Sequence, residues 1–142
     1  MLITLLHPDW VYILPVNGLK DQYTSAEEFW QHHGKWVVTG DKAYIMDLAF
    51  RLDPLVEAGK IEQAKFTKKD PKTDPLPQVR EYALCAYADD RARRKTAGYL
   101  SALGVKGFRW KYDSQGITDW SPGGALAEAA ARVGRSVDPL TY

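Results

Sequence analysis

Short strand-forming runs and amphipathic helical stripes follow one another in a fixed order between Lys35 and Asp113, and this order limits the folds open to the chain. Apolar residues recur there at the periods typical of half-buried strands and of core-facing helices. The order is strand, helix, strand, strand, helix, strand, which is compatible with a split βαβ arrangement. The strands are expected at residues 35–39, 61–68, 80–88 and 106–113. We therefore predict an α+β fold, an antiparallel sheet with both helices packed on one face and the other face open; a ferredoxin-like sheet is the alternative.

Capping residues define the ends expected for the two crossover helices. An aspartate precedes each helix and a glycine follows it, as the preferences at helix ends require. The helices are expected at 41–58 and from Asp89 or Asp90 to Leu103. Asp53-Pro54 interrupts the first of them, and because proline breaks the helical hydrogen-bond pattern we expect a kink or a restart there.

The rest of the chain is expected to add smaller elements to one domain, residues 1–142. Ser25 and Glu28 form a capping box, which predicts a short helix from Ser25 to about His32. Gly34 is expected to be the residue that stops this helix. Further strands are expected within 1–6 and at 10–16, a Pro-rich loop at 70–77, an alanine-rich helix at 123–133 and a tail at 134–142.

The last strand separates aromatic from cationic side chains. In the run KGFRWKYD, Phe108, Trp110 and Tyr112 alternate with Arg109 and Lys111. Burying three aromatic rings is favourable and burying two cations is not, so we expect the rings beneath the helices and the cations on the open face. The run is similar to the signature of RNA-recognition motifs, but that motif needs a small residue in place of Arg109 and an aliphatic one in place of Lys111.

The strand that contains Lys65 has the same design, with Ala64 and Phe66 on the opposite side from Lys65. We therefore expect Lys65, Arg109 and Lys111 to converge into a patch suited to a phosphate or carboxylate. The competing interpretation is an ordinary solvated sheet face on which these cations pair with carboxylates such as Asp113 and Glu62.

Composition excludes several classes of function. The formal net charge of the 142-residue chain is +1, so it lacks the overall basicity of proteins that bind duplex DNA. Its single cysteine, Cys85, excludes an internal disulfide and a thiolate zinc cluster. The N-terminal MLITLL is too short for a signal sequence and no apolar run reaches membrane-spanning length, so a cytoplasmic protein with no membrane partner is expected.

Motifs for metal or cofactor chemistry are missing from the sequence. His32 and His33 are adjacent and would point in different directions from a helix, which makes a poor metal pair. No glycine-rich phosphate loop or nucleophile elbow is present. We therefore expect no metal and no cofactor, and a hydrolytic enzyme is not supported.

A second group of cations, Arg91, Arg93, Arg94 and Lys95, occupies the first turns of a predicted helix. Positive charge at this end opposes the helix dipole, which points to an anionic partner. A plain solvated helix surface explains the same cluster equally well.

Several short motifs together resemble the Bles03-type family of unknown function. They are Gly34-Lys35-Trp36, Glu57-Ala58-Gly59-Lys60, Ala64-Lys65-Phe66-Thr67, Cys85-Ala86-Tyr87, Asp89-Asp90, Leu103-Gly104 and Arg109-Trp110-Lys111-Tyr112-Asp113. The resemblance implies a fold similar to the cap-binding translation initiation factors, a curved antiparallel sheet backed by helices. It also aligns Lys65, Arg109 and Lys111 with basic positions of the family's strand motifs. Some bacterial relatives are labelled phosphothreonine-lyase-like.

These observations favour a small binding domain for a phosphorylated or nucleotide-like ligand, with RNA among the ligands considered. Lys65, Arg109 and Lys111 would contact phosphate, and Trp36 or Trp30 would stack a base. Two alternatives remain open. One is a lyase that eliminates phosphate from phosphoserine or phosphothreonine with Lys65 or Lys111 as base, although the sequence offers no convincing acid. The other is a protein-interaction module or effector that uses the helical cluster of arginines and lysine.

Overall fold

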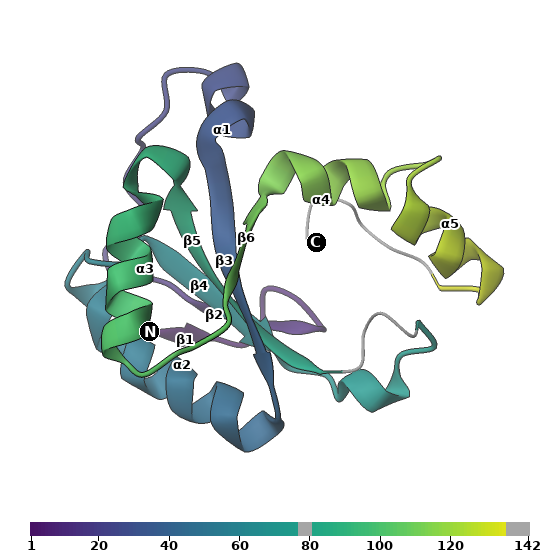
Figure 1. The fold of residues 1–142 in the computed structure, drawn as a ribbon, viewed down its shortest axis with the longest axis horizontal. Coiled ribbons are helices and arrows are strands. Elements are labelled where there is room, and N and C mark those ends of the chain that lie inside the picture. The colour runs from purple at the N-terminus through teal and green to yellow at the C-terminus, as the bar shows by residue number, and fades with distance from the viewer. Residues whose placement is uncertain (77–80, 136–142) are drawn as a thin grey trace.

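A computed structural model describes residues 1–76 and 81–135, and within them the strands form one open, curved antiparallel sheet (Figure 1). The sheet has six strands among the described residues, in the order β1-β2-β4-β5-β3-β6. These are β1 (Leu2–Ile3), β2 (Trp10–Ile13), β3 (His33–Gly40), β4 (Gln63–Thr67), β5 (Tyr82–Asp89) and β6 (Arg109–Tyr112). The predicted α+β class with an antiparallel sheet is confirmed.

Two crossover units build the centre of the sheet. Helix α2 (Lys42–Glu57) connects β3 to β4, and helix α3 (Arg93–Ala102) connects β5 to β6. Strand β5 pairs antiparallel with both β3 and β4, and β3 pairs antiparallel with β6, so each helix crosses over one intervening strand. This is the predicted split βαβ connectivity, and β1 and β2 extend it beyond β4.

Two C-terminal helices lie on the other side of the sheet from α2 and α3 (Figure 1). Helix α4 (Asp113–Trp120) follows β6 directly, and α5 (Ala125–Arg132) lies within the predicted alanine-rich helix. Leu76, from the Pro-rich loop, packs with Trp120 and Ala130 into a small separate apolar cluster. Helix α4 was not predicted, and it borders the sheet face that was expected to be fully open.

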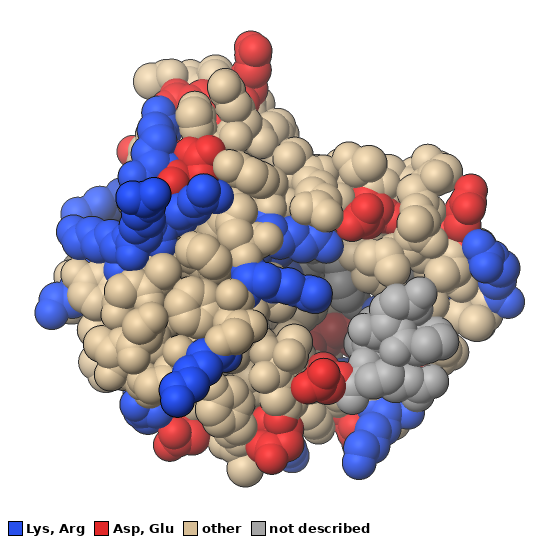
Figure 2. All heavy atoms as spheres, in the orientation of Figure 1, with Lys and Arg blue, Asp and Glu red and all other residues tan. Residues whose placement is uncertain are grey.

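The surface is hollowed between the sheet and α4, and Lys and Arg side chains border the hollow (Figure 2). No helix among the described residues is long and apolar enough to cross a membrane.

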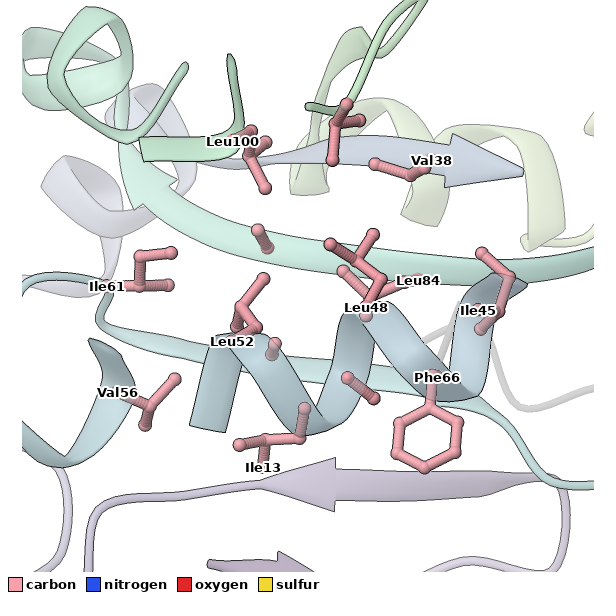
Figure 3. Packing of buried hydrophobic residues seen from close by; sticks show 14 of the residues in the cluster. Ile13, Val38, Ile45, Leu48, Leu52, Val56, Ile61, Phe66, Leu84 and Leu100 are labelled. Atoms are coloured by element: carbon pink, nitrogen blue, oxygen red, sulfur yellow. The ribbon is translucent and has the colours of Figure 1, made fainter. Parts of the chain in front are cut away.

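The main core lies between the sheet and the two crossover helices (Figure 3). Helix α2 contributes a stripe at helical spacing to this core, and α3 contributes Leu100. The strand residues that meet these helices are those predicted from the alternation, including Ala64, Phe66 and, partly buried, Phe108. The fully buried side chains include Ile13, Ile45, Leu48, Leu52, Ile61, Leu84 and Leu100.

The helix caps follow the sequence at α1 (Ala26–His32) and α2 but not at α3. Helix α3 begins at Arg93 after Ala92 with no side-chain cap, because Asp89 caps the short 3-10 helix Asp90–Ala92 instead. Ser25 caps α1 by accepting a hydrogen bond from the Glu28 backbone N–H, and Asp41 caps α2 in the same way. Helix α2 continues through Pro54, so the predicted restart at this point is wrong. Asp53 lies inside this continuous helix, and its carboxylate accepts a hydrogen bond from the N-terminal amine of Met1.

Gly34 does not end α1, as the sequence analysis expected, but lies within β3 on the helix-covered face. The helix ends at His32, as predicted, and the chain passes directly into the strand. A Cβ atom at Gly34 would collide with the Trp110 ring and lie 2.8 Å from the carbonyl oxygen of Lys111. Glycine is required here because β3 and β6 approach each other closely over the indole.

We expect Gly34→Ala to lower the free energy of unfolding by about 1–3 kcal/mol, the usual cost of overpacking a close contact. The matched control is Gly98→Ala in α3, where an added Cβ meets nothing within 4 Å. Alanine is the better helix former, so this control is expected to raise stability by about 0.5–1 kcal/mol. Urea denaturation of both variants measures the difference, and equal stability for the two would contradict the close approach of β6 at Gly34.

Candidate anion-binding site on the open sheet face

Three lysines from three strands point to the sheet face opposite α2 and α3. Lys35 of β3 is the cross-strand partner of Lys111 on β6 and of Tyr87 on β5. Lys65 of β4 is the partner of Cys85 on β5, one row along the same face. We call Lys35, Lys65 and Lys111 the lysine face.

The lysine face is largely removed from water. Lys35 and Lys65 are 4% and 2% exposed, and the Lys111 side chain is 24% exposed. Burial above all, together with the charges of Lys35 and Lys111, lowers the pKa of Lys65 to about 8. The pKa of Lys111 is lowered by its burial and by Lys35. The positive charges of the three lysines therefore act on one another across this face.

Arg109 lies on the same sheet face as the three lysines, but not among their buried side chains. It is the partner of Val37 at the sheet edge, and its side chain is exposed. Lys111 lies on the same strand, three strand spacings from β4, so it is the exposure of the Arg109 side chain, rather than the number of strands, that sets Arg109 apart. The structure thus places Arg109 at the rim, while Lys35, which the sequence analysis did not select, takes the central position.

The two tryptophans proposed to stack a base lie away from the lysine face. Trp36 projects to the helix-covered face, where it contacts Phe108 and Trp110 edge-on, and its Nε1 donates a hydrogen bond to the carbonyl of Arg93. Trp30 lies on α1 with its ring against Phe29. Because Trp36 alternates with Lys35 along β3, the two side chains cannot meet one ligand on the lysine face.

Aromatic rings of other residues surround Lys65 instead. Its ammonium nitrogen lies 4.2 Å from the centre of the Trp10 ring and 6.0 Å from that of Tyr87. Tyr12 is the cross-strand partner of Lys65 on β2 and therefore lies on the same face. Contacts of a cation with ring faces are favourable and partly compensate for the lost hydration of the ammonium.

A buried ion network adjoins the lysines at the start of β3. His33 is 2% exposed, and its Nδ1 and Nε2 lie 2.5 Å from Asp113 Oδ2 and 2.9 Å from Glu62 Oε1. Lys35 Nζ lies 3.2 Å from the other oxygen of Asp113. We call His33, Lys35, Glu62 and Asp113 the His33 network.

The geometry of the network makes His33 a cation. Both ring nitrogens face carboxylate oxygens, so both carry a proton and donate. Burial on its own lowers the pKa of His33, but the hydrogen bonds to Asp113 and Glu62 outweigh it and raise the pKa to about 9. Burial raises the pKa of Asp113, whereas His33 and Lys35 more than offset this and hold that pKa below its ordinary value. The Tyr87 ring stacks on His33 at 5.6 Å.

Helix α4 supplies a carboxylate to a second lysine. Asp119 lies 3.5 Å from Lys111, and Asp113, the first residue of the same helix, binds Lys35. Among the cations of the competing interpretation, Lys111 thus pairs with a carboxylate, Asp119, whereas Asp113 pairs with Lys35 and Glu62 with His33. An ammonium group has three donors, so such a pair is compatible with an additional anion.

The cationic cluster at α3 is a separate surface. Lys and Arg side chains gather over this part of the molecule (Figure 2). Arg91 is bound to Asp89 and Glu28, and Arg93 lies 5.7 Å from the centre of the Trp110 ring. Arg94 and Lys95 are exposed. No structural contact favours a partner at this cluster over a solvated helix.

One group among the described residues has the composition of a metal site. His32, Asp89 and Asp90 offer ligand atoms within 4.8 Å of one another. Asp89 already accepts hydrogen bonds from Arg91 and Tyr23, and Asp90 accepts one from Tyr112 and contacts His32. These contacts occupy the oxygens that a cation would need, so we assign no metal to them.

His33 was missed because the strand predicted at 35–39 begins two residues later than β3, and neither Lys35 nor Tyr87 was selected as a site residue. Extending the alternation back by two residues places His33 on the face of Lys35, and that signal was available. Cys85 is buried on the lysine face as the cross-strand partner of Lys65. No feature of the sequence indicated which carboxylates would meet these residues.

Comparison with protein-family models, with curated proteins and with solved structures finds no match to this chain. The interpretation of the site therefore depends on its geometry.

We expect the His33 network to make stability depend on pH. The folded-state pKa of about 9 exceeds the ordinary value of 6.5, so the stabilisation is complete below pH 6.5 and is lost as pH rises toward 9. Between pH 6.5 and pH 8 the unfolding free energy should fall by about 1–2 kcal/mol. Chemical denaturation at a series of pH values measures this slope.

His33→Gln should abolish this slope and lower stability at pH 6.5, because it leaves buried carboxylates without their cation. His32→Gln is the control: it retains His33 and should retain the slope. Burial of Lys65 acts in the opposite sense, since its lowered pKa adds stability as pH rises above about 8. A wild-type slope unchanged in His33→Gln would contradict the proposed charge state of His33.

Proposed function

We propose that this protein binds a small phosphorylated ligand, such as a mononucleotide, on the lysine face. The observation that carries the proposal is the gathering of Lys35, Lys65 and Lys111 from three strands onto one buried face. Three ammonium groups in a medium of low dielectric attract a dianion much more strongly than the same groups in water. Phosphate is the common biological dianion that accepts several such hydrogen bonds at once.

The surroundings of the lysines support a ligand with a planar part. Trp10 and Tyr87 lie against Lys65, and Tyr12 is on the same face. These rings, rather than Trp36 or Trp30, are placed to contact a base or another ring attached to the phosphate. Arg109 at the rim would contact a longer ligand, such as a second phosphate or an RNA strand, and Lys65 and Lys111 would hold the first phosphate.

Calorimetric titration at low salt tests the proposal with inorganic phosphate, AMP and a short single-stranded RNA as separate ligands. Lys111→Gln should weaken phosphate and AMP binding about tenfold or more, since a hydrogen bond to a charged group is worth about 1.5–3 kcal/mol. Lys106→Gln, which removes an exposed lysine in the turn before β6, should bind as the wild type does. Absence of binding to all three ligands, or equal affinity of Lys111→Gln and wild type, would refute the site.

A second candidate activity is elimination of phosphate from phosphoserine or phosphothreonine. The lowered pKa of Lys65, about 8, favours it because a fraction of the amine is neutral near pH 7 and can accept the proton on the substrate's Cα. The C–O bond then breaks and phosphate leaves with the electron pair. Both ring nitrogens of His33 are held by carboxylates, so the network assigns no proton donor to the leaving phosphate.

Mass spectrometry of a phosphothreonine peptide incubated with the protein decides this second candidate. Elimination removes phosphoric acid and leaves a dehydrated residue, whereas hydrolysis leaves threonine. Lys65→Met should abolish any elimination, and an unchanged peptide mass with the wild-type protein would reject it.

A further inference from the structure

Lys111 is the member of the lysine face that water reaches. Its side chain is 24% exposed, whereas Lys35 and Lys65 are almost completely buried. Arg109 lies two residues earlier on β6, on the same side of the strand, and is exposed. An anion that arrives from solvent therefore meets Lys111 and Arg109 without having to enter the buried part of the face.

A carboxylate accompanies this accessible lysine. Asp119 Oδ2 lies 3.5 Å from Lys111 Nζ, and the Asp119 side chain is 31% exposed. The pair joins the sheet to α4, and the surface is hollowed between these two parts of the molecule (Figure 2). An ammonium group donates three hydrogen bonds and a carboxylate accepts several, so the pair offers both a donor and an acceptor to one small molecule.

Both ends of α4 are fixed, which holds Asp119 in this position. The first residue of the helix, Asp113, belongs to the His33 network. The last residue, Trp120, is buried in the small apolar cluster with Leu76. A carboxylate that is already held in place binds a hydrogen-bond donor at a lower cost in conformational entropy than a mobile one.

A carboxylate within an anion site distinguishes anions by whether they carry a proton. An ionised carboxylate only accepts hydrogen bonds, so it binds a hydroxyl group and repels the bare oxygens of an anion. Inorganic phosphate carries at least one P–OH group at neutral pH, and a phosphate monoester carries one near or below its second pKa of about 6. Sulfate is tetrahedral like phosphate but has no proton at these pH values.

We propose that Asp119 accepts a hydrogen bond from the P–OH group of a protonated phosphate whose other oxygens are bound at Lys111. The inference rests on the proposed function and names the protonation state of the phosphate that this site takes. An unprotonated anion is attracted by Lys111 and Arg109 but repelled by Asp119. Asp119 is thus the residue that determines specificity, because cations alone would bind phosphate and sulfate equally well.

Calorimetric titration of the full chain with sodium phosphate and with sodium sulfate, at pH 6 and low salt, tests the inference. The wild-type protein should bind phosphate at least about tenfold more tightly than sulfate, the effect of one hydrogen bond to a charged group. Asp119→Asn should reduce this ratio to about twofold or less, because an amide donates as well as accepts and so suits both anions. The reduction should come mainly from tighter binding of sulfate.

Two further variants make the outcome specific. Asp47→Asn removes an exposed carboxylate from α2, on the opposite side of the sheet, and should leave the ratio as in the wild type. Asp119→Glu retains an acceptor and should retain a preference for phosphate. Equal affinity of the wild-type protein for the two anions would overturn the inference. The same holds if Asp119→Asn binds both anions more tightly by the same factor, since Asp119 would then only oppose anions.

The wild-type titrations separate failure of this inference from failure of the proposed function. If phosphate binds and sulfate binds equally well, the role of Asp119 is wrong and the phosphate site stands. If neither phosphate nor AMP binds, the proposed function is wrong, and the inference with it. These results need no variant, so they remain decisive even if Asp119→Asn fails to fold.

Discussion

The contact of His33 with two carboxylates is the interaction on which the arrangement of the lysine face depends. It joins the first residue of β3 to Glu62, just before β4, and to Asp113, the first residue of α4. The same Asp113 binds Lys35, so one carboxylate fixes both the start of α4 and the position of a central lysine. A buried cation held by two anions stays favourable only while all the partners are present, and this makes the local geometry an all-or-none feature.

The two faces of the sheet bury different kinds of side chain. On the helix side, aliphatic residues of α2 and α3 exclude water and need no polar partners. On the lysine side, charged groups are almost as deeply buried, and each pair of charges must offset a large loss of hydration. Because the side chains of a strand alternate, β3 supports both faces, with Trp36 and Val38 toward the helices and His33 and Lys35 toward the ions.

The separation of these faces could be predicted from the sequence, whereas the partners of the ions could not. Alternation in the strands of Lys65 and Lys111 correctly indicated which residues lie opposite the helices. It could not indicate that Asp113 begins a helix, because the run DSQGITDW has weak helical signals and α4 depends on contacts with β3 and α1. The ion network joins residues 29 and 80 positions apart in the chain, and no local pattern encodes such a distance.

Burying Lys65 is a poor choice if stability is the only requirement. Its lowered pKa means that folding disfavours the charged form, and an aliphatic residue at the same position would not lose this free energy of hydration. Sites where a sequence departs from the local rules of stability are those where function is expected to reside. The helix side of the same strand follows these rules at Ala64 and Phe66, so the departure is confined to one face. This contrast within five residues of β4 is the physical reason to look for a ligand among the lysines rather than at the arginines of α3.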